Sequence, residues 1–108
     1  MIITGTNIYM TRGDSEVLTV SCPERPFVAG DKVELTVRYP AGTGRVLLHK
    51  AVTEFADGKA VIVIAPEDTA KLSFCKASYD LQLTFADGTV KTIIRPSEFE
   101  IGAENTYE

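Results

Sequence analysis

The sequence predicts an all-β fold, an antiparallel β-sandwich of about seven short strands with one short helical turn. Residues 79–85 alternate between apolar and polar side chains, which is typical of a strand with one buried face. A second β-rich run covers residues 89–94, and Ala86-Asp87-Gly88 separates the two runs. Because an Asp-Gly pair tolerates the positive φ of a tight hairpin, we expect these two runs to be neighbouring strands.

Earlier segments show related patterns. Residues 17–22 give the first strong strand signal, and residues 33–39 give a clean alternating strand. Residues 46–55 are apolar but change phase, which a β-bulge near His49 would explain, since one extra residue re-phases a strand. We expect a final short strand after Pro96-Ser97. Phe99 and Ile101 belong to this final strand. The side chains expected in the core are Leu18, Val20, Cys22, Val33, Leu35, Val37, Tyr39, Tyr79, Leu81, Leu83 and Phe85.

Residues 60–65 differ from the other strands because they are apolar at every position. This pattern suits a strand that is covered on both faces. The second cover would be either the segment after Pro66 or another subunit. We therefore expect Val61, Val63 and Ala65 to form a possible interaction surface.

The helical candidate is residues 66–72. Pro66 suits the first turn of a helix, and the acidic side chains of Glu67 and Asp68 suit its N-terminal dipole. A closed small barrel is the alternative fold, because alternation alone does not distinguish it from two packed sheets. A short helical crossover between strands favours the sandwich.

One four-residue sequence occurs twice. Phe55-Ala56-Asp57-Gly58 recurs as Phe85-Ala86-Asp87-Gly88. The flanking residues differ, and a hydrophobic residue followed by Asp-Gly is what hairpin ends select. We interpret the repeat as two turns with the same residue preferences rather than as a duplication.

The composition fits a single domain over residues 1–108, with an ordered core at about residues 8–101 and a polar tail at residues 102–108. The net charge is −4, and the eleven basic residues stand singly, so we expect no nucleic-acid partner. No apolar run is long enough for a membrane helix, and the N-terminus shows no signal peptide. We therefore expect folding in a cytoplasm, with Cys22 and Cys75 reduced.

The sequence offers no catalytic or metal-binding motif. His49 is the single histidine, and no serine or cysteine lies near it in the sequence as a nucleophile. Cys22, Cys75 and His49 lack the short paired spacings of zinc sites. We expect no catalytic residue, no metal, no cofactor and no enzymatic activity.

Arg12-Gly13-Asp14-Ser15 contains the tripeptide that integrins recognise. The functional interpretation is adhesion to a host cell through an exposed turn formed by Arg12, Gly13 and Asp14. The structural interpretation is a turn before the first strand, in which Asp14 or Ser15 caps the backbone. We favour the structural interpretation.

The order of these motifs resembles that of small phage or prophage structural proteins of Gram-positive bacteria. More distantly, it resembles the N-terminal immunoglobulin-like domain of phage baseplate upper proteins, and the resemblance extends from about Ile8 to Ile101. The segments that carry it are Arg12-Gly13-Asp14-Ser15, Phe27-Val28-Ala29-Gly30-Asp31, residues 33–37, residues 53–60, Ala65-Pro66-Glu67-Asp68-Thr69, residues 79–83, residues 87–97 and Phe99.

The resemblance implies an immunoglobulin-like β-sandwich that acts as a non-enzymatic structural or docking module of a phage tail or baseplate. Its partners would be other tail or baseplate proteins, or further copies of itself. It would reside in the bacterial cytoplasm before assembly and then in the virion. Two alternatives remain open: an immunoglobulin-like module that binds a carbohydrate or a host protein, and a small phage-encoded inhibitor of a host protein.

Overall fold

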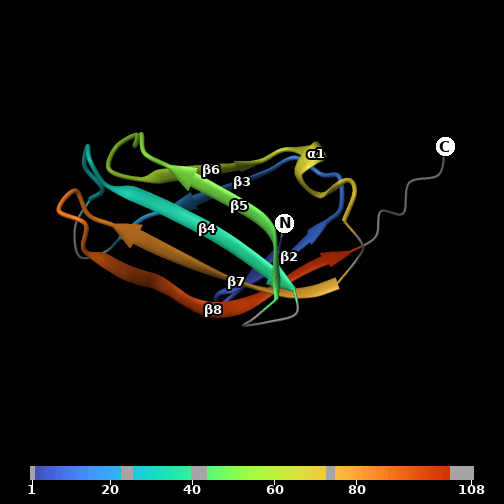
Figure 1. Cartoon of the computed structure of the whole chain (residues 1–108). Coiled ribbons are helices and arrows are strands. Elements are labelled where there is room, and N and C mark those ends of the chain that lie inside the picture. The colour runs from blue at the N-terminus through green and yellow to red at the C-terminus, as the bar shows by residue number, and fades with distance from the viewer. Residues whose placement is uncertain (1, 23–25, 40–43, 73–74, 103–108) are drawn as a thin grey trace.

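The computed structural model describes residues 2–22, 26–39, 44–72 and 75–102, which form two layers of β-strands (Figure 1). A short helix lies at one end of the layers, where it connects a strand of one sheet to a strand of the other. The elements are β1 (Ile2–Thr4), β2 (Asn7–Thr11), β3 (Glu16–Val20), β4 (Lys32–Tyr39), β5 (Arg45–Val52), β6 (Ala60–Ile64), α1 (Pro66–Thr69), β7 (Cys75–Thr84) and β8 (Val90–Gly102).

The two sheets are unequal in size. One has six strands in the order β1-β2-β8-β7-β4-β5, and the other pairs β3 with β6. The chain therefore folds as the predicted β-sandwich. The prediction of a wholly antiparallel arrangement is wrong at one place, because β2 and β8 run parallel. These strands come from opposite ends of the chain, so no tight turn forces them to be antiparallel.

The core lies between the sheets and contains most of the predicted side chains. Val33, Leu35 and Val37 of β4 are fully buried. Tyr39 was expected in the core as well, but 49% of it is exposed. β3 and β6 have five residues each and β4 has eight, so the smaller sheet is too short to cover the end of β4. The other predicted core residues that are buried are Leu18, Val20, Tyr79, Leu81 and Leu83, and Cys22 and Phe85 pack partly buried against the core. Phe99 and Ile101 of the last strand are buried in the same core.

The predicted bulge in β5 exists, but it lies before His49. Val37 pairs with Leu48 and Arg38 pairs with Val46, which leaves one extra residue on β5. As a result Leu48 is buried and Val46 is exposed, although both have the same parity in the sequence.

The C-terminal strand is longer than predicted. β8 is a single strand of thirteen residues, so the expected break at Pro96-Ser97 is absent. Tyr79 pairs with Ser97 and Leu81 pairs with Ile94, which leaves an extra residue on β8 at Arg95-Pro96. Proline has no N–H for a ladder, and an irregularity of this kind accommodates it within a strand.

The ends of the ordered region also differ from the prediction. β1 lies before the expected start at Ile8, and β2 includes it. The two strands form a hairpin around Gly5, whose φ is +61°. Gly102, expected in the tail, ends β8 and is buried. The rest of the expected tail, residues 103–108, lies outside the described residues.

Helix α1 is shorter than the predicted segment 66–72, and it makes the predicted crossover between the sheets, from β6 to β7. Asp68 accepts a hydrogen bond from the backbone N–H of Ala65 at 2.7 Å, which satisfies one donor at the helix start. Within the part of the chain that the structure describes, no helix is long and apolar enough to cross a membrane.

Candidate docking surface

The outer face of the two-stranded sheet is apolar. β3 and β6 pair in antiparallel register, with Val17 opposite Val63 and Thr19 opposite Val61. Alternation directs the intervening side chains into the core, where Leu18 and the alternate residues of β6 are buried. Of the three outward valines, 55% of Val17, 40% of Val61 and 56% of Val63 are exposed. We call Val17, Thr19, Val61 and Val63 the outer valine face.

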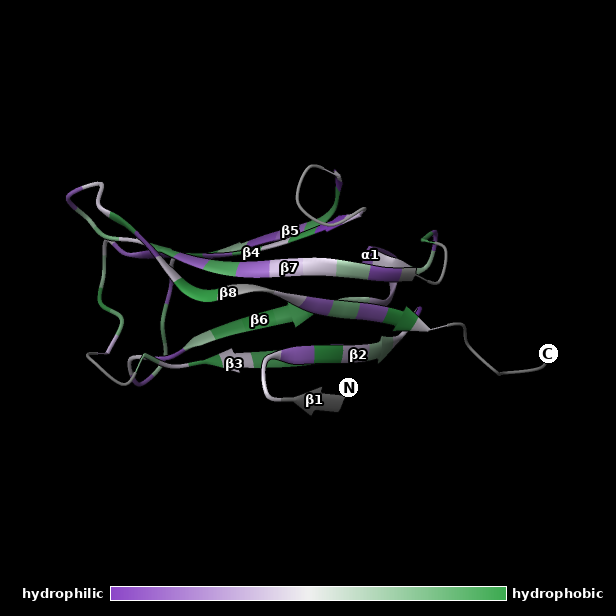
Figure 2. Cartoon of the chain, turned by 90° about the horizontal axis from the view of Figure 1, so that it is seen from below, coloured by the Kyte–Doolittle hydropathy of each residue, from purple (hydrophilic) through white to green (hydrophobic). Residues whose placement is uncertain are grey.

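Two of the three residues expected at an interaction surface, Val61 and Val63, lie on the outer valine face. Ala65 is half-buried and lies beyond the end of β6, where α1 begins. The exposure of Val61 and Val63 shows that α1 does not cover them. β6 is hydrophobic over most of its length, and β3 lies beside it in the same layer (Figure 2).

Sequence reasoning missed the contribution of Val17. The residue lies within the predicted strand 17–22, on the face opposite Leu18 and Val20. The missing information was the pairing of β3 with β6, which places Val17 beside Val63. The signal that could have found it is a β-branched residue at both outward positions of the strand, Val17 and Thr19.

An open cleft lies between β3 and strands of the larger sheet. Its volume is about 380 Å³, and its lining comes from the β1–β2 turn and from β2, β3, β7 and β8. Among the residues that the structure describes, no charged side chain contributes to this lining. We call it the β3 cleft, and its lining residues are Gly5, Thr6, Ile8, Leu18, Thr19, Val20, Ser21, Tyr79, Leu81, Ile93 and Ile94.

Tyr79 fixes one rim of the β3 cleft. Its hydroxyl donates a hydrogen bond to the backbone carbonyl of Thr6, in the turn between β1 and β2. Its ring meets Phe99 edge to face, with centroids 5.8 Å apart. Burial raises the pKa of Tyr79 above its ordinary value of 10.0, so the hydroxyl stays neutral near pH 7. The rim of the β3 cleft at Tyr79 is therefore uncharged.

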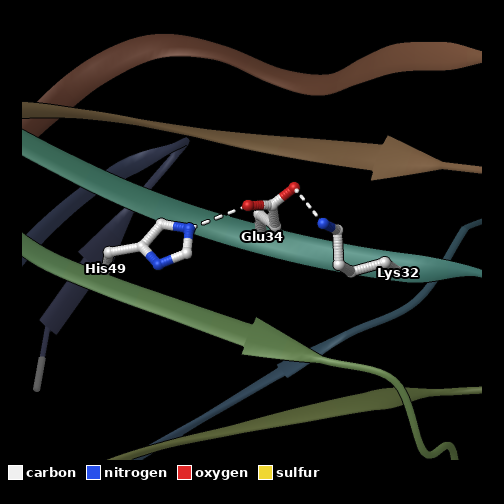
Figure 3. A network of polar contacts seen from close by, with 3 residues as sticks. All are labelled: Lys32, Glu34 and His49. Atoms are coloured by element: carbon white, nitrogen blue, oxygen red, sulfur yellow. Dashed lines mark hydrogen bonds and ion pairs between the residues drawn. The ribbon is translucent and has the colours of Figure 1, made fainter.

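A polar network occupies a different surface, on β4 and β5 (Figure 3). His49 Nε2 lies 2.8 Å from Glu34 Oε2, and Lys32 Nζ lies 3.3 Å from Glu34 Oε1. The hydrogen bond from His49 lowers the pKa of Glu34, and the nearby Lys32 lowers it further. Partial burial acts in the opposite direction but is outweighed. Glu34 and His49 are a diagonal pair across β4 and β5, and pairs of this kind stabilise the exposed face of a sheet. Lys32 lies two residues from Glu34 on the same strand.

The Arg12-Gly13-Asp14 turn is attached to the region around α1. The Arg12 guanidinium donates to the carbonyl of Leu72 at 3.1 Å, and the Gly13 N–H donates to Thr69 Oγ1 at 2.9 Å. Gly13 has a φ of +83°, which favours glycine. Arg12 is half-buried and Asp14 is exposed, so the arginine lies against the fold while the aspartate faces solvent.

Among the described residues, no group of three or more His, Cys, Asp or Glu side chains is placed to hold a metal ion. Cys22 is a free, half-buried cysteine.

Fold and surface together define an immunoglobulin-like β-sandwich with an apolar outer face on its smaller sheet. The sandwich matches the crystal structure of CopC from Methylosinus trichosporium OB3b with a TM-score of 0.51 and 13% sequence identity. The match covers 94% of this chain and 89% of that one. At this identity the likeness concerns the fold. No protein-family model and no curated protein sequence matches the chain.

Proposed function

We propose that this chain is a non-enzymatic docking module that binds another protein, or a second copy of itself, through the outer valine face. The observation that carries the proposal is the clustering of Val17, Val61 and Val63, each at least two-fifths exposed, on adjacent strands. Single exposed apolar residues are ordinary on a protein surface, but contiguous ones mark interaction sites.

The energetics suit a modest contact. Covering the exposed part of each of the three valines contributes about 1 kcal/mol per side chain. This gain is too small for tight binding by itself, so the face serves as part of a larger contact. The resemblance of the sequence to phage structural proteins supports a tail or baseplate as the assembly in which that contact forms.

Lysine substitution at Val63 tests the proposal. Val63 and Val90 are equally exposed at 56%, but Val90 starts β8 and lies outside the outer valine face. Val63→Lys places a charge in the contact and should abolish self-association or complex formation with the products of neighbouring genes. Val90→Lys is the matched control and should leave both unchanged.

Light scattering over a concentration series measures self-association, and co-expression followed by purification measures binding to neighbouring gene products. Thermal unfolding of both variants shows that the fold is intact. A wild-type chain that stays monomeric and binds none of these proteins would overturn the proposal, as would an equal effect of both substitutions.

A further inference from the structure

We infer that the open edge of β3 binds an extended peptide segment of a partner, which adds a strand to the smaller sheet and inserts apolar side chains into the β3 cleft. This inference rests on the proposed docking function and specifies how the partner is held. The occupant is a flexible segment of the partner that becomes a strand on binding.

The backbone of β3 supplies the first argument. One edge of β3 pairs with β6, and no strand among the described residues pairs with the other edge. In an antiparallel pair, alternate residues direct their N–H and C=O groups towards the partner strand, and the rest direct them away. An unpaired row of such groups is a template for a further strand.

The cleft supplies the second argument. Leu18 and Val20 form its wall on β3, and Ile93 belongs to the opposite wall on β8. Every second side chain of an added strand would point towards the interior, as on β3 itself. A cavity of about 150 Å³ holds a benzene ring, so the 380 Å³ of the cleft accommodates two branched side chains.

The small area of the outer valine face argues against a folded domain that binds to this face alone. Two paired strands of five residues present a face of roughly 170 Å². A standard protein interface needs about 800 Å² from each partner. An edge strand of a folded domain would also keep its inward side chains in its own core, as Leu18 and Val20 are here, so it would have none to insert.

The charges around β3 specify the peptide further. The lining of the cleft is uncharged, so the inserted side chains are apolar. The exposed Asp14 precedes β3, in a chain of net charge −4. We therefore expect apolar residues at every second position of the peptide and a lysine or arginine at the end that lies beside Asp14.

Selection from a displayed library of random nine-residue peptides tests the inference. We expect enrichment of peptides with the stated pattern, and 1:1 binding of the synthesised peptides. In the free protein, the edge-facing amides of β3 should exchange hydrogen rapidly and the amides paired with β6 slowly. Bound peptide should slow the edge-facing set at least tenfold. Failure to enrich any peptide, or binding that leaves these amides unchanged, would overturn the inference.

Two variants locate the bound peptide. Ser21→Phe fills the cleft from an exposed position, and Ile93→Asp places a charge in its wall, so each should weaken peptide binding at least tenfold. Val90→Asp, on the same strand as Ile93 but outside the cleft, should not. Equal binding by the wild type and the Ser21→Phe variant would overturn the inference.

Val63→Lys separates this inference from the proposed function, because Val63 lies on β6 and outside the cleft. If Val63→Lys abolishes the partner complex and no peptide binds, docking through the outer valine face stands and strand addition fails. If peptides bind to β3 and Val63→Lys leaves the partner complex intact, strand addition stands and the outer valine face is not the contact.

Discussion

Asp68 connects β5, the end of β6 and the start of α1 through one carboxylate. Its Oδ2 lies 2.8 Å from Lys50 Nζ and accepts the Ala65 N–H at 2.7 Å. The hydrogen bond from Lys50, with that from Ala65, lowers the pKa of Asp68 below its ordinary value of 3.8. A lowered pKa means that the ionised form stabilises the fold. This stability is present above pH 3.8 and is lost as the pH falls through the lower folded pKa.

We predict that Asp68→Asn lowers the free energy of unfolding by about 1 kcal/mol at pH 7, because the amide keeps the shape but loses the charge. The difference from the wild type should shrink as the pH falls below 3.8. Denaturant titrations at pH 7 and at low pH measure both values. If the difference in unfolding free energy between the wild type and Asp68→Asn did not change with pH, the stabilising role of the ionised Asp68 would be contradicted.

Leu83 tests the parity of β7. Only 1% of the residue is exposed, and it pairs with Val33 of β4 in the centre of the larger sheet. Leu83→Ala should cost about 2–5 kcal/mol, as the loss of a buried branched side chain does. Gln82→Ala, on the other face of the same strand, should stay near the 0.5 kcal/mol of surface changes. If denaturant titration gave similar losses of stability for the two variants, the assignment of Leu83 to the buried face of β7 would be wrong.

At the scale of elements, the repeated sequence Phe-Ala-Asp-Gly forms two different turns. At the first copy, Asp57 and Gly58 have φ values of +53° and +71°. The backbone N–H of Ala56 donates to the carbonyl of Lys59, and the N–H of Lys59 donates to the carbonyl of Ala56. At the second copy, Gly88 has a φ of +93°, and Phe85 N–H donates to the Thr89 carbonyl. The first is a two-residue loop, and the second is one residue longer.

This difference predicts unequal costs for alanine. A Cβ at Gly58 would lie 2.4 Å from Pro26 Cβ, whereas a Cβ at Gly88 would meet nothing within 4 Å. Gly88→Ala should cost about 1 kcal/mol, from its positive φ alone. Gly58→Ala should cost at least twice as much, because it adds a steric clash. Thermal unfolding of the two variants measures the ratio, and equal values would contradict the prediction.

The sequence was sufficient to predict the elements with strict alternation, because a period of two defines both the strand and its inner face. β4 and β7 are the clearest cases, with Leu35 and Leu81 fully buried as expected. The start of the fold could not be predicted in this way. β1 has three residues, which is too few for a periodic signal. Its place depends on pairing with β2, which the residues around it do not encode.

Phase changes were harder to place than strands. The bulges at Leu47 in β5 and at Arg95-Pro96 in β8 depend on the register of neighbouring strands. The prediction placed the first bulge slightly late and read the second as a strand end. A proline is disfavoured inside a paired strand, so only the pairing of β8 with β7 could show that the strand continues through Pro96.

At the scale of the whole molecule, the inequality of the sheets determines the candidate site. The pattern of residues 60–65 predicted an interaction surface at Val61, Val63 and Ala65, but not that Val17 of another strand would lie beside them. Val17 and Val63 lie side by side only because β3 and β6 form a sheet of their own. That two-stranded sheet also produces the open edge and the cleft beside it. These features arise from topology, which a run of apolar residues does not specify.

The parallel pairing of β2 with β8 has a consequence for how the chain folds. Thr6 and Asn7 bond to Ser97 and Glu98 across 91 residues of sequence, so the pairing of β2 with β8 cannot form until both ends of this sequence separation are available. Contacts of such range make folding slow, on a scale of about milliseconds to seconds. During synthesis on the ribosome, Ile8 and Met10 must remain without their partners Phe99 and Ile101 until β8 has been made. Until then the nascent chain exposes two large apolar side chains that the folded protein buries.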